Sequence, residues 1–254
     1  MILRWLAFMG SGMLAGVFSG GLGVGGGIVA TPLIRFLGVS AYLAIGTTVP
    51  AILPSAITGT FRYTRSGLID KRVVAFVAPG AVVTTIAGAL ATRHFNGHVL
   101  MLITAFTLLV LALRTLPSKR PIDDTLDVSP NPLGLVLLGI VTGAMSGLLG
   151  VGGGFLMVPV FTRVFKMKVK TAIGTSLAVI SVIVTPNLIA QSYVGNIDWK
   201  VAALLAMGVI PGAWLGAGLA IRAPEQKLRV VVGVALAIVA VAYGAFELRA
   251  LLSA

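Results

Sequence analysis

The sequence predicts an all-α polytopic membrane protein made of two inverted repeats of about five segments each, eight to ten segments in total. Each repeat is expected to carry a glycine-rich broken helix. Of the 254 residues, 57% are hydrophobic and only 10% are charged, whereas soluble domains carry about 25% charged residues. A glycine-rich motif occurs twice. A loop rich in Lys and Arg in one repeat corresponds to a loop poor in them in the other. These three observations predict the fold class.

Apolar blocks of membrane-spanning length fill most of the chain, as a span needs roughly 20 apolar residues. The first block carries one cation, Arg4, and lacks a cleavage-type site, so we expect it to be retained and not removed as a signal peptide. Shorter apolar stretches follow the two glycine clusters, at Ile28–Leu37 and Phe155–Phe165. The long blocks are Ile2–Ser19, Tyr42–Phe61, Val73–Thr92, Val99–Leu116, Leu133–Leu149, Thr171–Tyr193, Val201–Ile221 and Leu228–Leu252.

The glycine-rich motif is part of an internal repeat. Residues 16–27, GVFSGGLGVGGG, align with residues 143–154, GAMSGLLGVGGG, and Pro32 then matches Pro159. With one inserted residue, AIGTT at 44–48 matches AIGTS at 172–176. Because the order is kept along the chain, the repeat indicates duplication. We therefore expect a first repeat over 1–116, a polar linker over 117–132 and a second repeat over 133–254.

Loop cations indicate that the two repeats are inverted. The loop at 62–72 has four Lys and Arg residues, but its counterpart near 194–200 has only Lys200. The preceding loop shows the reverse, with one cation near 35–41 and four at 163–170. An odd number of crossings per repeat places fourteen cations on one side and five on the other, whereas parallel repeats of four crossings give no bias. Since cations collect on the cytoplasmic side, inverted repeats are favoured, with both termini facing away from the cytoplasm.

The glycine clusters are expected to break their helices inside the membrane. Each Gly costs about 1 kcal/mol relative to Ala in a helix interior, and unwound backbone is tolerated in a bilayer only where protein covers it or it lines a cavity. Breaks at matching positions of two repeats indicate a transporter's binding site. The helix after each break would present free N–H groups to an oxyanion near the midplane. The predicted glycine ligands are Gly25, Gly26, Gly27, Gly152, Gly153 and Gly154.

Other glycines suit close packing of helices. Gly12, Gly16 and Gly20 form a small-residue stripe, as do Gly139, Gly143 and Gly147, and Gly208, Gly212 and Gly216 let a further helix approach closely. For the triple glycines, packing alone is the alternative to a substrate-facing break.

Hydroxyl and amide side chains are the second group of candidate ligands. They can donate hydrogen bonds to an anion without a buried charge. The alternatives are a hydroxyl bonded to a carbonyl of its own helix, and an amide bonded between helices. Asn187 corresponds to Gly59 in the first repeat, so the site is expected to be asymmetric. The candidates are Thr31, Thr47, Thr48, Thr175, Ser176, Asn187 and Gln191.

Ionisable groups are absent from the centres of the predicted spans. Asp70, Asp198, Glu225 and Glu247 lie at or near predicted ends, and the other acids lie in the linker. No nucleophile–base pair or metal-ligand cluster stands within a span, so we expect no enzyme activity, no cofactor and no metal. The net charge of +12 comes from the loops, so the expected partners are a small anion and the bilayer and not nucleic acid. No feature indicates an oligomeric state, and any proton coupling would act through protonation of the substrate.

The paired motif, with Pro32, Pro159 and the AIGTT and AIGTS segments, resembles the TauE/SafE sulfite exporter family over essentially the whole chain. The resemblance implies a multi-pass protein of the bacterial cytoplasmic (inner) membrane that exports sulfite, an organosulfonate or a related anion. The motif positions are the six glycines above with Thr47, Thr48, Thr175 and Ser176. A channel for anions and a transporter of small carboxylates remain alternatives.

Overall fold

The chain folds into helices and the loops that join them. The computed structural model describes residues 2–115 and 131–224, together with positions 234, 237, 238, 240, 241, 243–245, 248 and 249. Most of the predicted linker and of the last apolar block lies outside these residues. The elements are α1 (Ile2–Leu22), α2 (Gly27–Phe36), α3 (Ala41–Arg65), α4 (Lys71–Ala91), the 3-10 helix η1 (Thr92–His94), α5 (Gly97–Thr115), α6 (Pro132–Leu149), α7 (Gly154–Arg163), α8 (Val169–Val194) and α9 (Trp199–Arg222).

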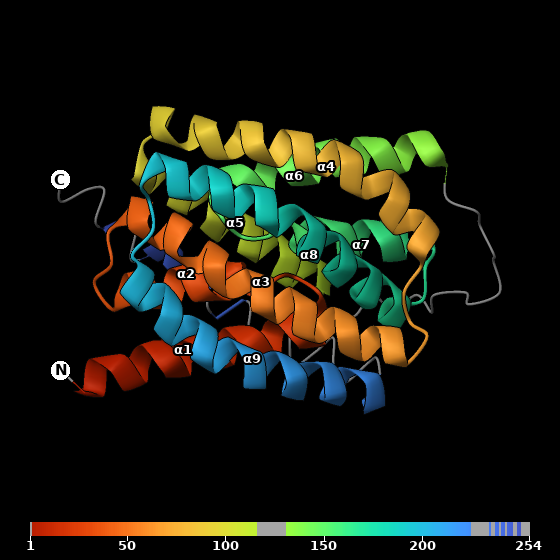
Figure 1. Ribbon diagram of the computed structural model, residues 1–254, viewed down its shortest axis with the longest axis horizontal. Helices are drawn as coiled ribbons and strands as arrows, with labels where there is room; N and C mark the ends of the chain where they lie inside the picture. Colours follow the sequence, from red (N-terminus) through yellow and green to blue (C-terminus); the bar gives the residue numbers. More distant parts are fainter. Residues whose placement is uncertain are drawn as a thin grey trace.

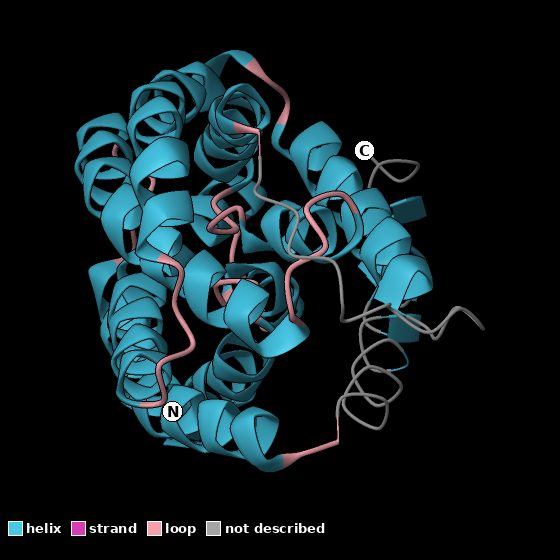
Figure 2. Ribbon diagram, turned by 90° about the vertical axis from the view of Figure 1, so that its right-hand side faces the viewer, coloured by secondary structure: helices cyan, strands magenta, loops and turns pink. Residues whose placement is uncertain are grey.

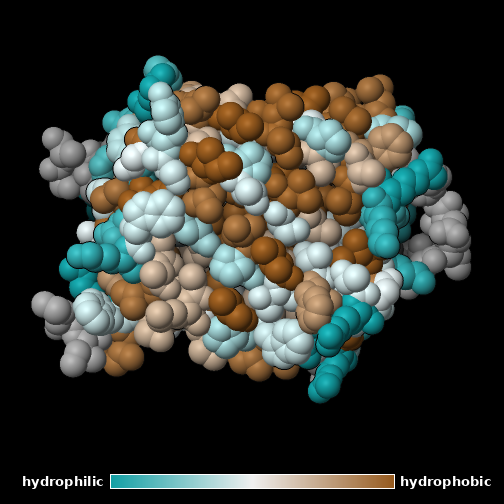
Figure 3. Space-filling model, in the orientation of Figure 1, coloured by the Kyte–Doolittle hydropathy of each residue, from teal (hydrophilic) through white to brown (hydrophobic). Residues whose placement is uncertain are grey.

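Six of these helices are long and apolar enough to cross a membrane, namely α1, α3, α4, α6, α8 and α9. They lie roughly along one direction in Figure 1 and are seen end-on in Figure 2. In Figure 3 hydrophilic residues gather at the two ends of the bundle, and a mostly apolar band lies between them. The chain is therefore an all-helical multi-pass membrane protein, as predicted.

Two helices, α2 and α7, are too short to cross. Each has 10 residues and so measures about 15 Å, half of the roughly 30 Å hydrocarbon thickness. The Arg4 guanidinium donates to the Leu37 carbonyl at 3.2 Å, which places the end of α2 beside the start of α1. Likewise a Cβ on Gly134 in α6 would lie 3.2 Å from the Phe165 ring just after α7. Each helix pair is therefore a re-entrant hairpin that enters and leaves at one end of the bundle.

The two hairpins enter from opposite ends. In Figure 1 α1 begins at the left end, beside the N label, whereas α6 begins at the right end. Plain hydropathy gives the length of each apolar segment but not its path, so the sequence left open whether the short segments after the glycine clusters cross the membrane. Among the described residues, six helices have sufficient length to cross, two of which, α1 and α6, are the long arms of the hairpins, and three apolar helices are shorter, Gly97–Thr107 being the third.

Helices α4 and α9 begin at matching caps. One Asp70 carboxylate oxygen accepts from the backbone N–H groups of Arg72, at 2.9 Å, and Val73, at 3.1 Å. The Asp198 carboxylate accepts from Lys200 and Val201 in the same way, at 3.0 and 3.2 Å. An Asp side chain satisfies N–H groups that have no partner inside the helix, so these acids fix where the two helices start.

The longest helix contacts join the two halves of the chain. Helix α1 packs along α9, and α6 packs along α4 (Figure 1). Glycines make this approach possible, because an added Cβ would overlap a backbone carbonyl of the facing helix. The prediction that the glycine stripes pack helices is confirmed. Gly12, Gly16 and Gly20 face the carbonyls of Leu205, Val209 and Ala213, and Gly139, Gly143 and Gly147 face those of Val77, Ala81 and Thr85.

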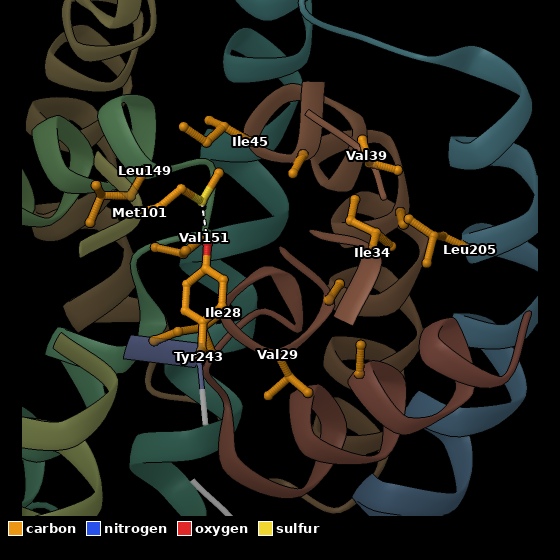
Figure 4. Packing of buried hydrophobic residues seen from close by; sticks show 14 of the residues in the cluster. Ile28, Val29, Ile34, Val39, Ile45, Met101, Leu149, Val151, Leu205 and Tyr243 are labelled. Carbon is orange, nitrogen blue, oxygen red and sulfur yellow. Dashed lines mark hydrogen bonds between the residues drawn. The ribbon is translucent and has the colours of Figure 1, made fainter. Parts of the chain in front are cut away.

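One buried cluster includes residues from both glycine segments. Val24 and Ile28 from the first segment share it with Leu149 and Val151 from the second. Figure 4 shows Val151 and Ile28 beside Tyr243, whose hydroxyl points to the sulfur of Met101. This cluster therefore brings the two glycine segments into one part of the core.

Candidate functional site

Four unwound residues interrupt the helices at each glycine cluster. Gly23, Gly25 and Gly26 have φ values of +70°, +87° and +71°, a region that residues with a Cβ rarely adopt. The second interruption has the same form, with Gly150, Gly152 and Gly153 at +65°, +83° and +75°. Gly27 and Gly154 are the first residues of α2 and α7, and neither helix start has a side-chain cap. We call residues 23–26 and 150–153 the two breaks.

The two breaks contact each other inside the protein. All their residues are buried. A Cβ on Gly25 would lie 3.5 Å from the Cα of Gly152, and one on Gly27 would lie 2.7 Å from the Gly150 carbonyl oxygen. A Cβ on Gly154 would overlap the Gly23 carbonyl oxygen. The first residues of α2 and α7 therefore each pack against the opposite break, and the six predicted glycines come together at one place.

Two predicted hydroxyls hold the break of the opposite half. The Ser176 hydroxyl donates to the Gly23 carbonyl at 2.7 Å. The Thr48 hydroxyl lies 3.3 Å from the Gly150 carbonyl and 3.0 Å from that of Ile45, and it also lies 3.3 Å from the Thr31 hydroxyl. Carbonyls that end a helix lack intrahelical partners, so these side chains satisfy unwound backbone.

Two further predicted hydroxyls lie where the halves join. The Thr47 hydroxyl accepts from the Asp198 backbone N–H, and that of Thr175 accepts from the Asp70 backbone N–H, both at 2.9 Å. Asp70 caps α4, and Asp198 caps α9. Thr47 and Thr175 therefore tie the middle of one half to a helix start of the other.

Removing such a tie is expected to weaken the fold. Thr175→Val keeps the shape of the side chain but leaves the part-buried N–H of Asp70 without its acceptor. Leaving a buried donor unsatisfied costs about 1–3 kcal/mol, so thermal unfolding of the purified variant should begin at a lower temperature. Thr107→Val is the control, because the exposed Thr107 hydroxyl bonds only to Ile103 of its own helix. Equal stability of the two variants would contradict this role.

The predicted amides bind the turn before the second break. Asn187 donates through Nδ2 to the Ser146 carbonyl at 3.3 Å, and Gln191 donates through Nε2 to the Gly147 carbonyl at 3.1 Å. In the first half Tyr63 takes the place of Gln191, and its hydroxyl donates to the Gly20 carbonyl at 3.1 Å. Gln191 and Tyr63 therefore serve the same backbone position with different chemistry.

Sequence reasoning missed the polar residues of the hairpin helices themselves. Ser19 and Ser146 stand at the same place in the repeated motif, and both are fully buried next to a break. The Ser55 hydroxyl donates to Ser19 at 2.6 Å. Thr142 also faces the second break. The signal was available, since the repeated Gly-x-x-Ser-Gly places a hydroxyl one turn before each unwound segment.

The site contains no charged side chain. Across the described residues, the buried polar side chains are Ser, Thr, Asn, Gln and two Tyr, none of them charged, and no group of three or more His, Cys, Asp or Glu side chains that could hold a metal ion is found there. The arrangement offers hydroxyls, amides and backbone N–H groups. Such groups suit a small polar or anionic ligand.

Comparisons with known proteins agree with a membrane role. The sequence model of a family described as sulfite exporter TauE/SafE matches residues 8–243. A probable membrane transporter protein of Xylella fastidiosa is 30% identical, over 86% of this chain and 86% of its own length. The probable membrane transporter protein YunE of Bacillus subtilis is 27% identical over 87% and 89%. A probable membrane transporter of Methanocaldococcus jannaschii is 25% identical over 86% and 87%. No solved structure matches the chain significantly.

Proposed function

The chain belongs to the TauE/SafE sulfite exporter family of membrane transporters, and from that membership we propose that it is a secondary transporter that exports a small anion. The proposed substrates are sulfite, an organosulfonate or a related sulfur-containing anion. The observation that carries the proposal is that the uncapped starts of α2 and α7 are buried at the point where the two breaks contact each other. Helix N-termini attract anions through their free N–H groups and partial positive charge.

We further infer that the halves are inverted repeats. Matched contacts support this, since Gly23 lies against Ile173 as Gly150 lies against Ile45, and the Thr47 and Thr175 ties form a second matched pair. The entry of the two hairpins from opposite ends (Figure 1) is what an axis in the membrane plane requires.

Charge distribution supports one orientation in the membrane. Of the fourteen Lys and Arg residues in 2–115 and 131–224, four lie at the end where α1 begins, namely Arg4, Arg35, Arg93 and Lys200. The other ten lie at the end where α6 begins. Because cations collect on the cytoplasmic side, we place the second end in the cytoplasm and the protein in the bacterial inner membrane.

Transport by alternating access fits the packing better than conduction through an open channel. Every residue of the two breaks is buried, so a ligand can reach them only if helices move. The two glycine-packed pairs, α1 with α9 and α4 with α6, are the natural rigid units for such a movement. We propose that they rock against each other around the breaks.

The test is reconstitution of the purified protein in liposomes. Labelled sulfite should enter in exchange for internal sulfite and should saturate as its concentration rises, and isethionate and acetate serve as comparison anions. Ligand at about 100 times its Kd should also stabilise the protein by about 2.7 kcal/mol, a rise in Tm of roughly 5–10 °C. If a monodisperse, folded sample neither exchanges nor is stabilised by any of these anions, the proposal is wrong, and large single-channel currents would replace it with a channel.

A further inference from the structure

Three unpartnered polar atoms lie beside the start of α7. The Thr142 hydroxyl, the Ser146 hydroxyl and the Asn187 Oδ1 are buried without a hydrogen-bond partner, and all three residues are 0% exposed. Each such group costs about 1–3 kcal/mol, and natively buried polar groups are rarely left unpaired. Of the five such atoms among the described residues, these three belong to neighbouring residues beside one helix start, which points to a ligand site.

Contacts place the three residues around the cap of α7. Thr142 and Ser146 are one turn apart on α6 and share a face. Gly153, the N-cap of α7, fits against both, because a Cβ there would lie 2.5 Å from Thr142 Cγ2 and 3.4 Å from Ser146 Cβ. Asn187 reaches the same turn, since its Nδ2 donates to the Ser146 carbonyl. The ten-residue α7 begins there without a side-chain cap.

The corresponding place in the first half is already satisfied. Ala15 and Gly59 occupy the positions of Thr142 and Asn187 and bring no polar side chain. Ser19 occupies the position of Ser146, and it accepts from Ser55. The position of Ser55 is held in the second half by Ile183, which cannot donate. The two halves therefore have the same backbone arrangement at this place but different polar side chains.

We propose that the transporter binds one anion, off its pseudo-symmetry axis, between Thr142, Ser146, Asn187 and the start of α7, and that this anion is a singly charged oxyanion carrying a proton, such as hydrogen sulfite. This inference rests on the proposed function and names the substrate form of that site. The hydroxyls and N–H groups donate to the oxyanion oxygens. The Asn187 Oδ1 can only accept, and it has no donor in the protein, so the ligand must supply the donor.

Charge favours the same form. The site has no buried cation among the described residues, and the cost of taking an ion out of water rises with the square of its charge, so a dianion is far more costly than a monoanion. Protonation halves the charge of sulfite and creates the O–H that Asn187 needs. Sulfate and methanesulfonate have no such proton near neutral pH and should bind weakly, so this inference narrows the proposed substrates to sulfite and away from simple organosulfonates.

Among the described residues, no titrating side chain is found at this site. Tyr63 on α3 donates to the Gly20 carbonyl. The cations of the packed elements stand at helix ends, namely Arg62, Arg65, Lys71, Arg72, Arg163 and Lys170. At the other ends and loops lie Arg4, Arg93, His94 and His98. Any dependence of binding on pH near neutrality is therefore expected to follow the protonation of the anion.

Ser146→Ala and Thr142→Val test the site, because each removes an oxygen that has no partner in the protein. We expect each variant to be as stable as the wild type or more stable, and to bind sulfite about tenfold more weakly, a loss of about 1.4 kcal/mol. Ser19→Ala is the matched control in the first half, and it should lose stability but keep its affinity for sulfite. A residue with only a structural role would not combine higher stability with weaker binding.

Affinity is measured by thermal shift and by exchange in liposomes, with sulfite, sulfate and methanesulfonate as probes, in slightly acidic and slightly alkaline buffer. Apparent sulfite affinity should fall as the pH rises. Wild-type affinity in both second-half variants, or an equal loss in Ser19→Ala, would overturn the asymmetric site while leaving transport intact. Affinity independent of pH, or tight binding of sulfate, would overturn the protonated form. If the wild type binds none of the probes and exchanges neither sulfite, isethionate nor acetate, the proposed function itself is wrong.

Discussion

Gly154→Ala is expected to prevent assembly of the folded transporter. The added methyl group would overlap the Gly23 carbonyl oxygen and would lie 2.7 Å from Ile180 Cδ1 and 2.9 Å from Ser176 Oγ. The Gly23 carbonyl belongs to the other break and is itself held by Ser176, so it cannot move aside without losing that bond. Overpacking against a side chain costs about 1–3 kcal/mol, and against fixed backbone we expect at least about 3 kcal/mol.

The measurement is the yield of monodisperse protein and its Tm in detergent. Gly10→Ala is the control, since a Cβ at Gly10 meets nothing within 4 Å and alanine favours the helix. The control should match or exceed the wild type in stability. A well-folded Gly154→Ala protein would show that the two breaks are not in contact, and it would remove the basis for a shared central site.

Gly212→Val is expected to separate α9 from α1. A Cβ at this position would overlap the Met13 carbonyl oxygen and would lie 3.0 Å from the carbonyl carbon and 3.1 Å from the Cα of the same residue. Helix α9 therefore packs directly on the backbone of α1. In a membrane such close packing is the main attraction between helices. Valine would force the axes apart along the whole glycine-packed pair.

The expected result is a loss of folded protein comparable to that of Gly154→Ala, read as aggregation on size-exclusion chromatography. Ile210→Val, two residues away on α9, is the matched control, because Ile210 is 46% exposed on the outer face and the change removes only a methylene. If Gly212→Val elutes and melts like the control, then α1 does not rest on α9 in the membrane.

The positions of the polar and unwound residues could be predicted from the sequence, but their partners could not. The repeat identified Gly25–Gly27 and Gly152–Gly154, and local glycine chemistry is enough to predict an unwound backbone there. The tie between Thr175 and Asp70 joins residues 105 positions apart, and no local pattern encodes such a pair. Hydroxyls at 47, 48, 175 and 176 were interpreted as ligands, and the structure gives each of them a protein partner.

The asymmetry of the site shows where the repeat itself misleads. Alignment draws attention to what the halves share, such as the glycines. The alignment revealed that Asn187 lacks a counterpart. It did not reveal that Ser146 lacks a donor, because Ser55 was not known to donate to Ser19 and Ile183 therefore did not stand out at the corresponding position. Only a structure that brings α6, α7 and α8 together shows the unpartnered atoms.

The pairing of α1 with α9 has a consequence for biosynthesis. The ribosome makes α1 first, yet its binding partner begins at Trp199, nearly 180 residues after Leu22. At about 5–20 residues per second, roughly 10–35 s pass between the synthesis of α1 and that of α9. The glycine face of α1 is without its partner during this time. During that time other small-residue helices, α6 among them, are available to it. We therefore expect newly made chains to depend on insertion factors that shield glycine-rich helices, and truncation before α9 to leave a first segment prone to degradation.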